Sequence, residues 1–437
     1  MYIPRDVDIE LDLWKADSKH KPLLVRGARQ VGKTKTIREF SKKFDSFIEL
    51  NFEKDPRLKI LFSGELSPEV ICGNISTIFK TPIVPGKTLL FFDEIQECVQ
   101  AIASLRFFYE DMPGLHLIAA GSLLEFALSE IPTFGVGRIR SMFLYPISFS
   151  EFLEGAGERK LLERIKEANP GSPINELLHS RLVELVRKFI CLGGMPEIVA
   201  TYIETNDLYK CQLLLDDLIV SIQADFAKYR KKTPVSRLGE VFQAVVFQAG
   251  HKFVYSKACA QATHNQVKEA LQLLVTAGLI YTVTHSSCNG LPLGAGADAQ
   301  KQKMIVFDTG IFQRIMGLDL KDFLLSENFE AINKGNLAEQ FVGLELIKSG
   351  SCYQNQALYY WHREAKSSNA EVDYVISISQ KIVPLEVKSG TKGSMQSLYL
   401  FLREKNLDRG IRISNENFST YDSIEVYPLY AVGDLRI

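Results

Sequence analysis

The chain has 437 residues, and its 51 Lys and Arg residues against 52 Asp and Glu residues give a formal net charge of −1. At roughly 150 residues per domain, this length predicts about three domains. The hydrophobic share of 46% and the charged share of 24% are those of a globular protein, and they exclude a disordered, collagenous or coiled-coil chain. Because the net charge is so small, any affinity for nucleic acid must come from a local basic surface.

The sequence indicates neither a membrane span nor a disulfide framework. It contains no run of ~18 apolar residues, and residues 1–10 include three acids and lack the apolar segment of a secretory signal. The seven cysteines are scattered, odd in number and without a Cys-x-x-Cys pair, which argues against disulfides and zinc. We therefore expect a cytoplasmic protein without membrane contact.

The first 150 residues alternate short apolar runs with helical patterns, which predicts a parallel α/β sheet. The run at 89–92 is apolar throughout, as expected for a strand that is covered on both faces. A helix is predicted over 33–43, and strands are predicted over 23–25, 47–52, 89–92, 116–120 and 140–144.

From Ser148 to about Asp225 the pattern is helical, with a predicted turn or helix end at Gly193-Gly194-Met195-Pro196. Beyond Lys228, three helices followed by a two-stranded hairpin are predicted, which is a winged-helix arrangement. Asn265 is expected to cap the third helix. The first helix is expected over 237–249, the second opens with residues 256–260, and the third is expected over 265–276. The strands are expected over 279–284 and 304–307.

The last ~110 residues have an α-β-β-β-α-β order. The two helices are predicted over 335–348 and 394–405. The strands are predicted over 358–361, 371–377 and 381–388, with two further short strands near Ile411 and Val426.

A glycine-rich segment lies between the first predicted strand and the first predicted helix. It fits G-x-x-x-x-G-K-[ST] and reads Gly27-Ala28-Arg29-Gln30-Val31-Gly32-Lys33-Thr34. The two glycines let backbone N–H groups surround phosphates, and the helix N-terminus adds partial positive charge. Lys33 can reach the β and γ phosphates, and the Thr34 hydroxyl can bind Mg²⁺. The segment therefore predicts a site for ATP and Mg²⁺, with an ordinary glycine-rich turn as the alternative.

The apolar strand at 89–92 ends in Asp93-Glu94. A carboxylate at the end of a parallel strand lies beside the phosphate loop, which suits Asp93 for the shell of Mg²⁺. The adjacent Glu94 can orient and deprotonate an attacking water. The alternative interpretation is a pair of solvated acids at a strand end.

Ser122 and one of two arginines are weaker candidates for the nucleotide site. The strand at 116–120 is followed by Gly121-Ser122, and the Ser122 hydroxyl either senses the γ phosphate or caps a helix. Arg138 and Arg140 follow a further loop, and one of them is a candidate arginine finger toward a neighbouring subunit of a homo-oligomer.

The segment 228–285 has a formal charge of +6, because eight basic residues stand against Glu240 and Glu269. Such a local surface is expected of a DNA-binding element. The start of the predicted third helix adds His264, Asn265 and Gln266 as polar groups. The alternative is a nucleotide lid or a protein-docking module. The basic residues are Lys228, Arg230, Lys231, Lys232, Arg237, Lys252, Lys257 and Lys268.

Two predicted strands near the carboxyl terminus contain Asp373-x12-Glu386-x-Lys388. Period-two alternation places Glu386 and Lys388 on one face, and Asp373 on the neighbouring strand can point to the same spot. Two carboxylates can hold Mg²⁺ while Lys388 polarises a water, and Glu339 on the preceding helix is a further candidate ligand. The alternative is a set of solvated strand acids with a partner lysine.

In combination these motifs resemble a large prokaryotic family of AAA-like ATPases whose C-terminal region has a restriction-endonuclease-like core. The resemblance covers essentially the whole chain and implies ATP binding, with Lys33, Thr34, Asp93 and Glu94 in the usual roles. The C-terminal motif resembles the PD-(D/E)xK nuclease superfamily. Gly194-Met195-Pro196 is similar to the Gly-x-Pro turn that contacts the adenine side in signal-transducing P-loop ATPases. The motifs that carry the family resemblance are Gly-Ala-Arg-Gln-Val-Gly-Lys-Thr, Phe-Phe-Asp-Glu-Ile-Gln, Ala-Gly-Ser-Leu-Leu-Glu, Gly-Arg and Leu-Tyr-Pro-Ile-Ser-Phe-Ser-Glu-Phe.

We therefore expect an α/β protein with a P-loop core over 1–147, a helical lid over 148–227, a winged helix over 228–325 and a nuclease-like domain over 326–437. The expected function is a Mg²⁺-dependent ATPase that switches the placement of its DNA-binding and nuclease-like parts. One alternative is an ATP-dependent interaction or signalling switch with a catalytically silent C-terminal domain. Two others are a P-loop that binds nucleotide without turnover and a DNA-binding regulator.

Overall fold

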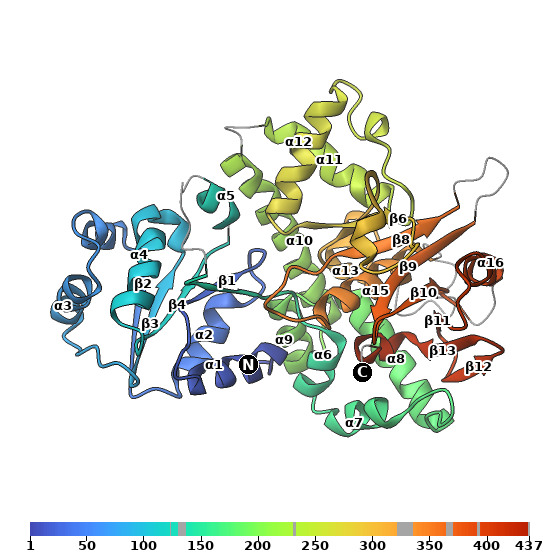
Figure 1. The fold of residues 1–437 in the computed structure, drawn as a ribbon, viewed down its shortest axis with the longest axis horizontal. Coiled ribbons are helices and arrows are strands. Elements are labelled where there is room, and N and C mark those ends of the chain that lie inside the picture. Colours follow the sequence, from blue (N-terminus) through green and yellow to red (C-terminus); the bar gives the residue numbers. More distant parts are fainter. Residues whose placement is uncertain are drawn as a thin grey trace. The chain divides into compact units, whose positions relative to one another are not determined.

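The structure is a computed structural model that describes residues 1–122, 124–129, 137–229, 233–320, 335–363, 370–390 and 394–435. It divides into two compact units, which are described separately (Figure 1). The first comprises Met1–Tyr145 with Ser351–Asn355, and the second comprises Pro146–Gly350 with Gln356–Ile437. Among the described residues, no helix combines the length and the apolar character needed to cross a bilayer.

A five-stranded sheet with the order β2-β3-β4-β1-β5 forms the centre of the first unit. Every neighbouring pair of strands is parallel, which confirms the predicted parallel α/β sheet. The strands are β1 Leu23–Arg26, β2 Ser46–Asn51, β3 Thr88–Asp93, β4 His116–Ala120 and β5 Arg140–Phe143. The helices are α1 Asp6–Ala16, α2 Lys33–Ser41, α3 Pro68–Phe79, α4 Val99–Asp111 and α5 Leu124–Ser129.

The core of this unit explains why β3 is apolar along its length. All six residues of β3 and all five of β4 are buried, because both strands lie inside the sheet with packing on both faces. On one face, edge-to-face aromatic contacts join Phe92 to Phe52, Phe62 and Phe108, with ring centroids 5.4–6.0 Å apart. This packing fixes the position at which β3 ends, and therefore the position of Asp93.

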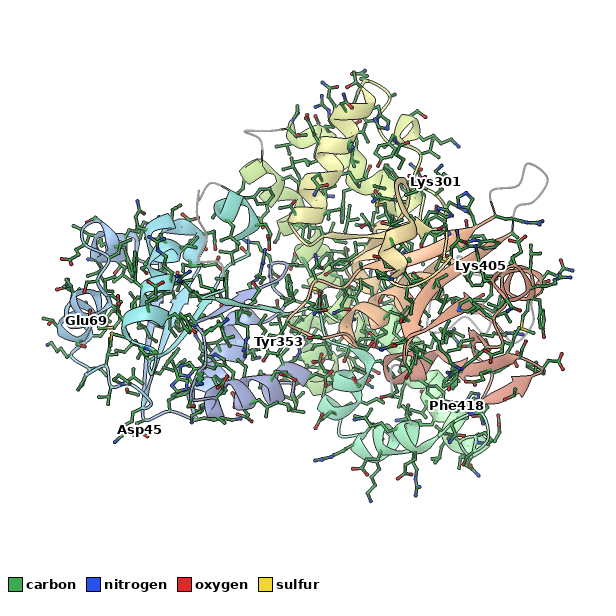
Figure 2. The ribbon with its side chains drawn as sticks, viewed as in Figure 1. Asp45, Glu69, Lys301, Tyr353, Lys405 and Phe418 are labelled. Carbon is green, nitrogen blue, oxygen red and sulfur yellow. The ribbon has the colours of Figure 1, made fainter. Side chains whose placement is uncertain are left out.

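The segment Ser351–Asn355 belongs to the first unit although it follows a helix of the second. The backbone N–H of Phe143 in β5 donates to the carbonyl oxygen of Cys352 at 2.7 Å. The Arg140 guanidinium lies over the ring of Tyr353, 5.4 Å from its centroid (Tyr353 is labelled in Figure 2). A short piece of chain distant in sequence therefore lies along the edge of the parallel sheet.

The second unit begins with the helical region that the sequence predicts. The turn at Gly193-Gly194-Met195 separates two helices, as expected, and the Gly194 N–H donates to Asp308 Oδ2 at 2.6 Å. The helices are α6 Phe149–Gly155, α7 Arg159–Glu167, α8 Glu176–Leu192, α9 Pro196–Thr205 and α10 Leu208–Asp225.

In the region predicted as a winged helix, the structure differs from the predicted second helix and from the predicted helix cap. The second predicted helix is only a 3₁₀ turn, Tyr255–Lys257, between α11 Val235–Phe247 and α12 His264–Thr276. The cap of α12 is Thr263, not Asn265, because Thr263 and Gln266 form a reciprocal capping box. The predicted hairpin is present, as antiparallel strands β6 Ile280–Ser286 and β7 Ala297–Val306.

This hairpin is part of a larger sheet. β6 pairs in parallel with β8, so that the hairpin forms one end of an eight-stranded sheet with the order β12-β13-β11-β10-β9-β8-β6-β7 (Figure 1). The element order from α15 to β11 follows the predicted α-β-β-β-α-β pattern. The elements are α13 Thr309–Ile315, α15 Asn336–Lys348, β8 Leu358–His362, β9 Glu371–Ile378, β10 Lys381–Val387, α16 Gln396–Lys405, β11 Gly410–Ser414, β12 Ser419–Tyr421 and β13 Ile424–Pro428.

Candidate functional site

The glycine-rich segment forms a loop between β1 and α2. Gly27 has φ +147°, and a Cβ at this position would lie 2.2 Å from the carbonyl oxygen of Leu144. Gly32 precedes α2 with φ +96°. Both positions therefore require glycine, since an L side chain would be strained at either and would collide with backbone at Gly27.

Lys33 points back into this loop. Its Nζ donates to the carbonyl oxygens of Gly27 at 2.9 Å and Ala28 at 2.8 Å, and the residue is only 7% exposed. Burial lowers the pKa of Lys33 to about 8, against the opposing effect of Glu94 and Asp93. The ammonium group is thus held inside the loop by two backbone carbonyl oxygens.

Thr34 and Asp93 meet at the carboxyl edge of the sheet. Thr34 Oγ1 lies 3.1 Å and 3.2 Å from the two carboxylate oxygens of Asp93, and the Asn51 amide donates to Asp93 Oδ2 at 2.8 Å. Burial, followed by the neighbouring Glu94, raises the pKa of Asp93. A hydroxyl and a buried carboxylate are oxygen ligands of the kind that Mg²⁺ prefers, so these residues fit the ion.

Glu94 is oriented by two further side chains. The Gln96 amide donates to Glu94 Oε2 at 2.7 Å, and the Ser122 hydroxyl lies 3.5 Å from the same oxygen. The Arg29 Nε donates to Ser122 Oγ at 3.3 Å. The structure therefore brings Arg29, Glu94 and Ser122, all three singled out in the sequence, into one hydrogen-bonded group.

Three supporting residues were given no role in the sequence analysis, although Gln96 ends one of the motifs quoted there. Arg5 is buried, and its guanidinium donates to the carbonyl oxygens of Val31 in the loop at 3.1 Å and of Tyr145 at 2.6 Å. Asn51 and Gln96 are the other two. Asn51 was the easiest to find, because it ends the strand in register with Asp93.

The two candidate arginine fingers have partners within the chain. Arg138 pairs with Glu110, and Arg140 lies over Tyr353. A finger role for either residue toward a neighbouring subunit stays a prediction.

In the second unit, Glu386 and Lys388 meet as the alternation predicts, with Lys388 Nζ 2.6 Å from Glu386 Oε1. Asp373 lies beside them, because its Oδ2 accepts the Val387 backbone N–H at 2.8 Å. Burial, followed by Asp373, raises the pKa of Glu386 to about 8. The three residues of the C-terminal motif are therefore neighbours in the fold.

The Glu339 carboxylate faces the ammonium group of Lys303. This carboxylate and those of Glu371 and Asp373 surround the Nζ of Lys303 at 3.0, 2.6 and 3.8 Å, respectively. Burial, against the opposing charge of Lys303, raises the pKa of Glu339 to about 7. In the part of the chain that the structure describes, no three His, Cys, Asp or Glu side chains are arranged to hold a metal ion. A metal-binding role for Glu339, Asp373 and Glu386 stays a prediction.

Only part of the predicted basic surface lies within the residues that the structure describes. Arg230, Lys231 and Lys232 lie outside the described residues, and Lys228 pairs with Asp225 at 3.6 Å. At the start of α12, the His264 ring packs against Tyr255 at 4.5 Å, while Gln266 is used in the helix cap. The exposed basic residues of this surface in the described ranges are Lys228, Lys252, Lys257 and Lys268.

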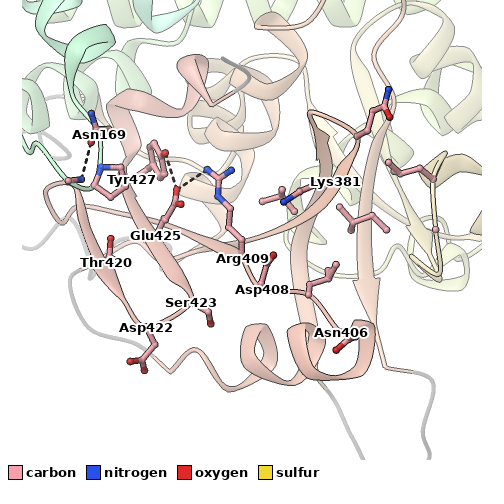
Figure 3. A pocket seen from close by; sticks show the side chains of 18 residues that line it. Asn169, Lys381, Asn406, Asp408, Arg409, Thr420, Asp422, Ser423, Glu425 and Tyr427 are labelled. Carbon is pink, nitrogen blue, oxygen red and sulfur yellow. Dashed lines mark hydrogen bonds and ion pairs between the residues drawn. The ribbon is translucent and has the colours of Figure 1, made fainter.

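A wide groove of 1360 Å³ lies toward the β12 end of the eight-stranded sheet, opposite the end formed by the β6–β7 hairpin (Figure 3). Its wall includes Glu425, which accepts hydrogen bonds from Arg409 at 2.8 Å and from the Tyr427 hydroxyl at 3.1 Å. Lys381 lines it at the start of β10, whereas Glu386 lies near the end of that strand. None of the residues singled out in the sequence lines this groove.

Residues 19–153 match the family model described as an AAA domain. This part of the chain is similar to an AAA domain and is called the AAA domain below. The match spans the glycine-rich loop, Asp93, Glu94 and Ser122, so that the AAA domain contains the whole of the first candidate site. Nucleotide binding is what such a fold implies. Residues 183–322 and 334–432 match two further families, each described as a domain of unknown function (DUF8612 and DUF4143).

No curated protein matches the sequence. Among solved structures, a Walker-type ATPase of Pyrococcus abyssi is 15% identical, with 72% of this chain and 96% of that chain covered and a TM-score of 0.47. The Aeropyrum pernix Orc1 protein in complex with DNA is 12% identical, with coverage of 74% and 96% and a TM-score of 0.29. The Thermotoga maritima RuvB Holliday junction branch migration motor is 14% identical, with coverage of 63% and 88% and a TM-score of 0.28. All three TM-scores lie below 0.5.

Proposed function

We propose that the AAA domain binds ATP with Mg²⁺ and hydrolyses it. The observation that carries this proposal is the meeting of the Thr34 hydroxyl with the Asp93 carboxylate next to the loop that holds Lys33. Thr34 and Asp93 would hold the ion, which when bound neutralises charge on the phosphates. Lys33 would contribute the second positive charge and donate to the β and γ phosphate oxygens.

Glu94 has the position and support expected of the general base. The Gln96 amide and the Ser122 hydroxyl both approach its Oε2, which fixes the direction of the carboxylate. The carboxylate would accept a proton from the attacking water, and the hydroxide equivalent would then displace ADP from the γ phosphorus. Ser122 is placed next to Glu94 and Arg29, where it can respond to the loss of the γ phosphate.

Nucleotide binding and hydrolysis are separated by two variants of the full-length chain. Lys33→Ala should abolish ATP binding in calorimetry, whereas Glu94→Gln should bind ATP with Mg²⁺ and release no phosphate. Unchanged phosphate release by Glu94→Gln would leave a site that binds nucleotide without using this base. Absence of any ATP or GTP binding by the parent chain would refute the proposal.

We further propose that the nucleotide cycle acts on nucleic acid through the surface around α12. Lys252, Lys257 and Lys268 are exposed there, whereas the buried residues of the helix are Val267, Ala270, Leu271, Leu273 and Leu274. A protein partner with an acidic surface is the alternative, and duplex binding that is insensitive to these lysines would favour it.

For the C-terminal region we propose an interaction role without phosphodiester cleavage. The supporting observation is that three of its carboxylates face Lys303 and are not arranged around a metal position. The alternative is metal-dependent cleavage with Asp373, Glu386 and Lys388. Incubation of the chain with plasmid, ATP and Mg²⁺ or Mn²⁺ tests this proposal, and nicking that is lost in Asp373→Ala would contradict it.

A further inference from the structure

A lysine from the β6–β7 hairpin lies at the centre of the C-terminal carboxylates. Lys303 Nζ is 2.6 Å from Glu371 Oε1, 3.0 Å from Glu339 Oε1 and 3.8 Å from Asp373 Oδ1. The first two distances are those of charge-assisted hydrogen bonds. An ammonium group has three N–H donors, which equals the number of carboxylates around it.

The ammonium group of Lys303 is buried within the second unit. Lys303 is 1% exposed, and its Nζ lies 5.2 Å from the centre of the Tyr360 ring. On another side the chain at Gly250 approaches so closely that a Cβ there would lie 3.2 Å from Glu339 Oε2. The ammonium group is therefore shielded from water, and its charge is balanced by these carboxylates and not by solvent.

The backbone of Lys303 is held from both sides. It pairs with Val283 of β6, and an isolated bridge joins it to Lys252. The Phe253 N–H donates to the adjacent Gln302 carbonyl oxygen at 2.8 Å. Lys303 thus extends from the interior of a strand, and its ammonium group is placed by the sheet.

We propose that Lys303 is the resident cation of this carboxylate cluster and occupies the position that a divalent metal ion would take. A divalent ion needs several oxygen ligands at about 2.0–2.6 Å around one point, and the ammonium nitrogen already fills that point. The inference deepens the proposed non-catalytic role of the C-terminal region, since it names the group that keeps metal out. It is independent of the nucleotide site in the AAA domain.

Metal binding to the full-length chain without nucleotide or nucleic acid tests this inference. Tyr374 donates to the Glu339 carbonyl oxygen at 2.8 Å, so tyrosine-sensitised Tb³⁺ luminescence reports on this cluster. We expect Lys303→Met to gain one bound Tb³⁺ or Mn²⁺ relative to the parent chain. Lys303→Met/Asp373→Asn should lose the gained ion. Lys301→Met is the matched control and should behave as the parent, because Lys301 (labelled in Figure 2) pairs with Asp298 and not with the three carboxylates.

Mn²⁺ binding by the parent chain tests the inference without any Lys303 variant, so the result does not depend on whether such a variant folds. If the parent binds Mn²⁺ and Asp373→Asn removes that ion, the inference is overturned. If Lys303→Met unfolds, recovery of its melting transition by Mn²⁺ supports the inference, and failure of Mn²⁺ to restore it contradicts it. Because these readouts contain neither ATP turnover nor DNA cleavage, their failure is separate from failure of the proposed function.

Discussion

Thr34 and Asp93 are 59 residues apart in sequence, and the Thr34 hydroxyl lies within 3.2 Å of both oxygens of the Asp93 carboxylate. Thr34 stands in the first turn of α2, and Asp93 ends β3. The contact exists because β1 and β3 run in the same direction on either side of β4, so that the loop after β1 and the end of β3 share one edge.

Removal of the Thr34 hydroxyl should weaken metal-assisted nucleotide binding. We expect Thr34→Val to lower ATP affinity at least tenfold in the presence of Mg²⁺, with a much smaller change when the ion is chelated. The reason is that the hydroxyl is a proposed ligand, while the loop backbone is unaffected. Calorimetry with and without EDTA measures both values. Thr77→Val on α3 is a control, since its hydroxyl bonds only to the Gly73 carbonyl oxygen among the described contacts.

The orientation of Glu94 can be disturbed without touching Glu94. A Cβ at Gly121 would lie 2.1 Å from Gln96 Oε1, so Gly121→Ala should displace the Gln96 amide that donates to Glu94. We expect kcat for ATP hydrolysis to fall about tenfold with an unchanged Kd for nucleotide, as for a positioning effect. Gln96→Ala should reproduce the loss. A variant with normal kcat would show that Gln96 does not position the base.

Arg5 should stabilise the phosphate loop from outside the motif. It is buried and joins the loop at Val31 to the chain at Tyr145. Arg5→Ala should lower the free energy of unfolding by about 1–3 kcal/mol, the range for buried carbonyl groups that lose a charged donor. It should also weaken ATP binding. Denaturant unfolding gives the first value, and unchanged stability would indicate that the loop holds its shape alone.

The stability of the AAA domain should depend on His116. Burial, followed by the adjacent His20, lowers the pKa of His116 to about 4, below its ordinary value of 6.5. Between these values the unfolded chain binds a proton that the folded chain does not. Above pH 6.5 this difference in pKa does not reduce the free energy of unfolding. As the pH falls toward 4, it lowers the free energy of unfolding by at most about 3 kcal/mol.

His116→Gln is the matched test of this pH dependence. Unfolding free energies measured between pH 4 and 7 should fall less steeply in the variant than in the parent. The His20 ring is stacked on His116 at 4.0 Å, so a His20→Gln variant shows how much of the effect depends on the neighbour. Parallel curves for parent and His116→Gln would contradict the prediction.

The surface around α12 should bind duplex DNA in a salt-dependent manner. Replacement of Lys252, Lys257 and Lys268 by Gln should weaken binding and reduce the slope of log K against log salt by up to about 3. Fluorescence anisotropy at several salt concentrations measures both. The control replaces Lys59, Lys87 and Lys166, which lie elsewhere on the chain. Equal effects of the two triple variants would indicate general charge attraction and not a defined surface.

Much of the nucleotide site follows from the sequence, because its parts are local. The loop from Gly27 to Thr34 is one continuous motif, and Asp93 and Glu94 directly follow a run of buried residues. Once the strands are parallel, their ends must share an edge, so the meeting of Thr34 with Asp93 could be predicted. The meeting of Glu386 with Lys388 follows in the same way from the two-residue period of a strand.

The remaining contacts were decided by the tertiary structure. Lys303 and Glu339 are 36 residues apart, and Arg5 and Tyr145 are 140 apart. No period or motif links such positions, because their contact depends on how whole elements pack. The sequence pattern of the β6–β7 hairpin predicts a local wing. In the fold, the pairing of β6 with β8 places Lys303 among the carboxylates. Sequence alone therefore indicated which groups are candidates for chemistry, whereas packing determined which cation the C-terminal carboxylates face.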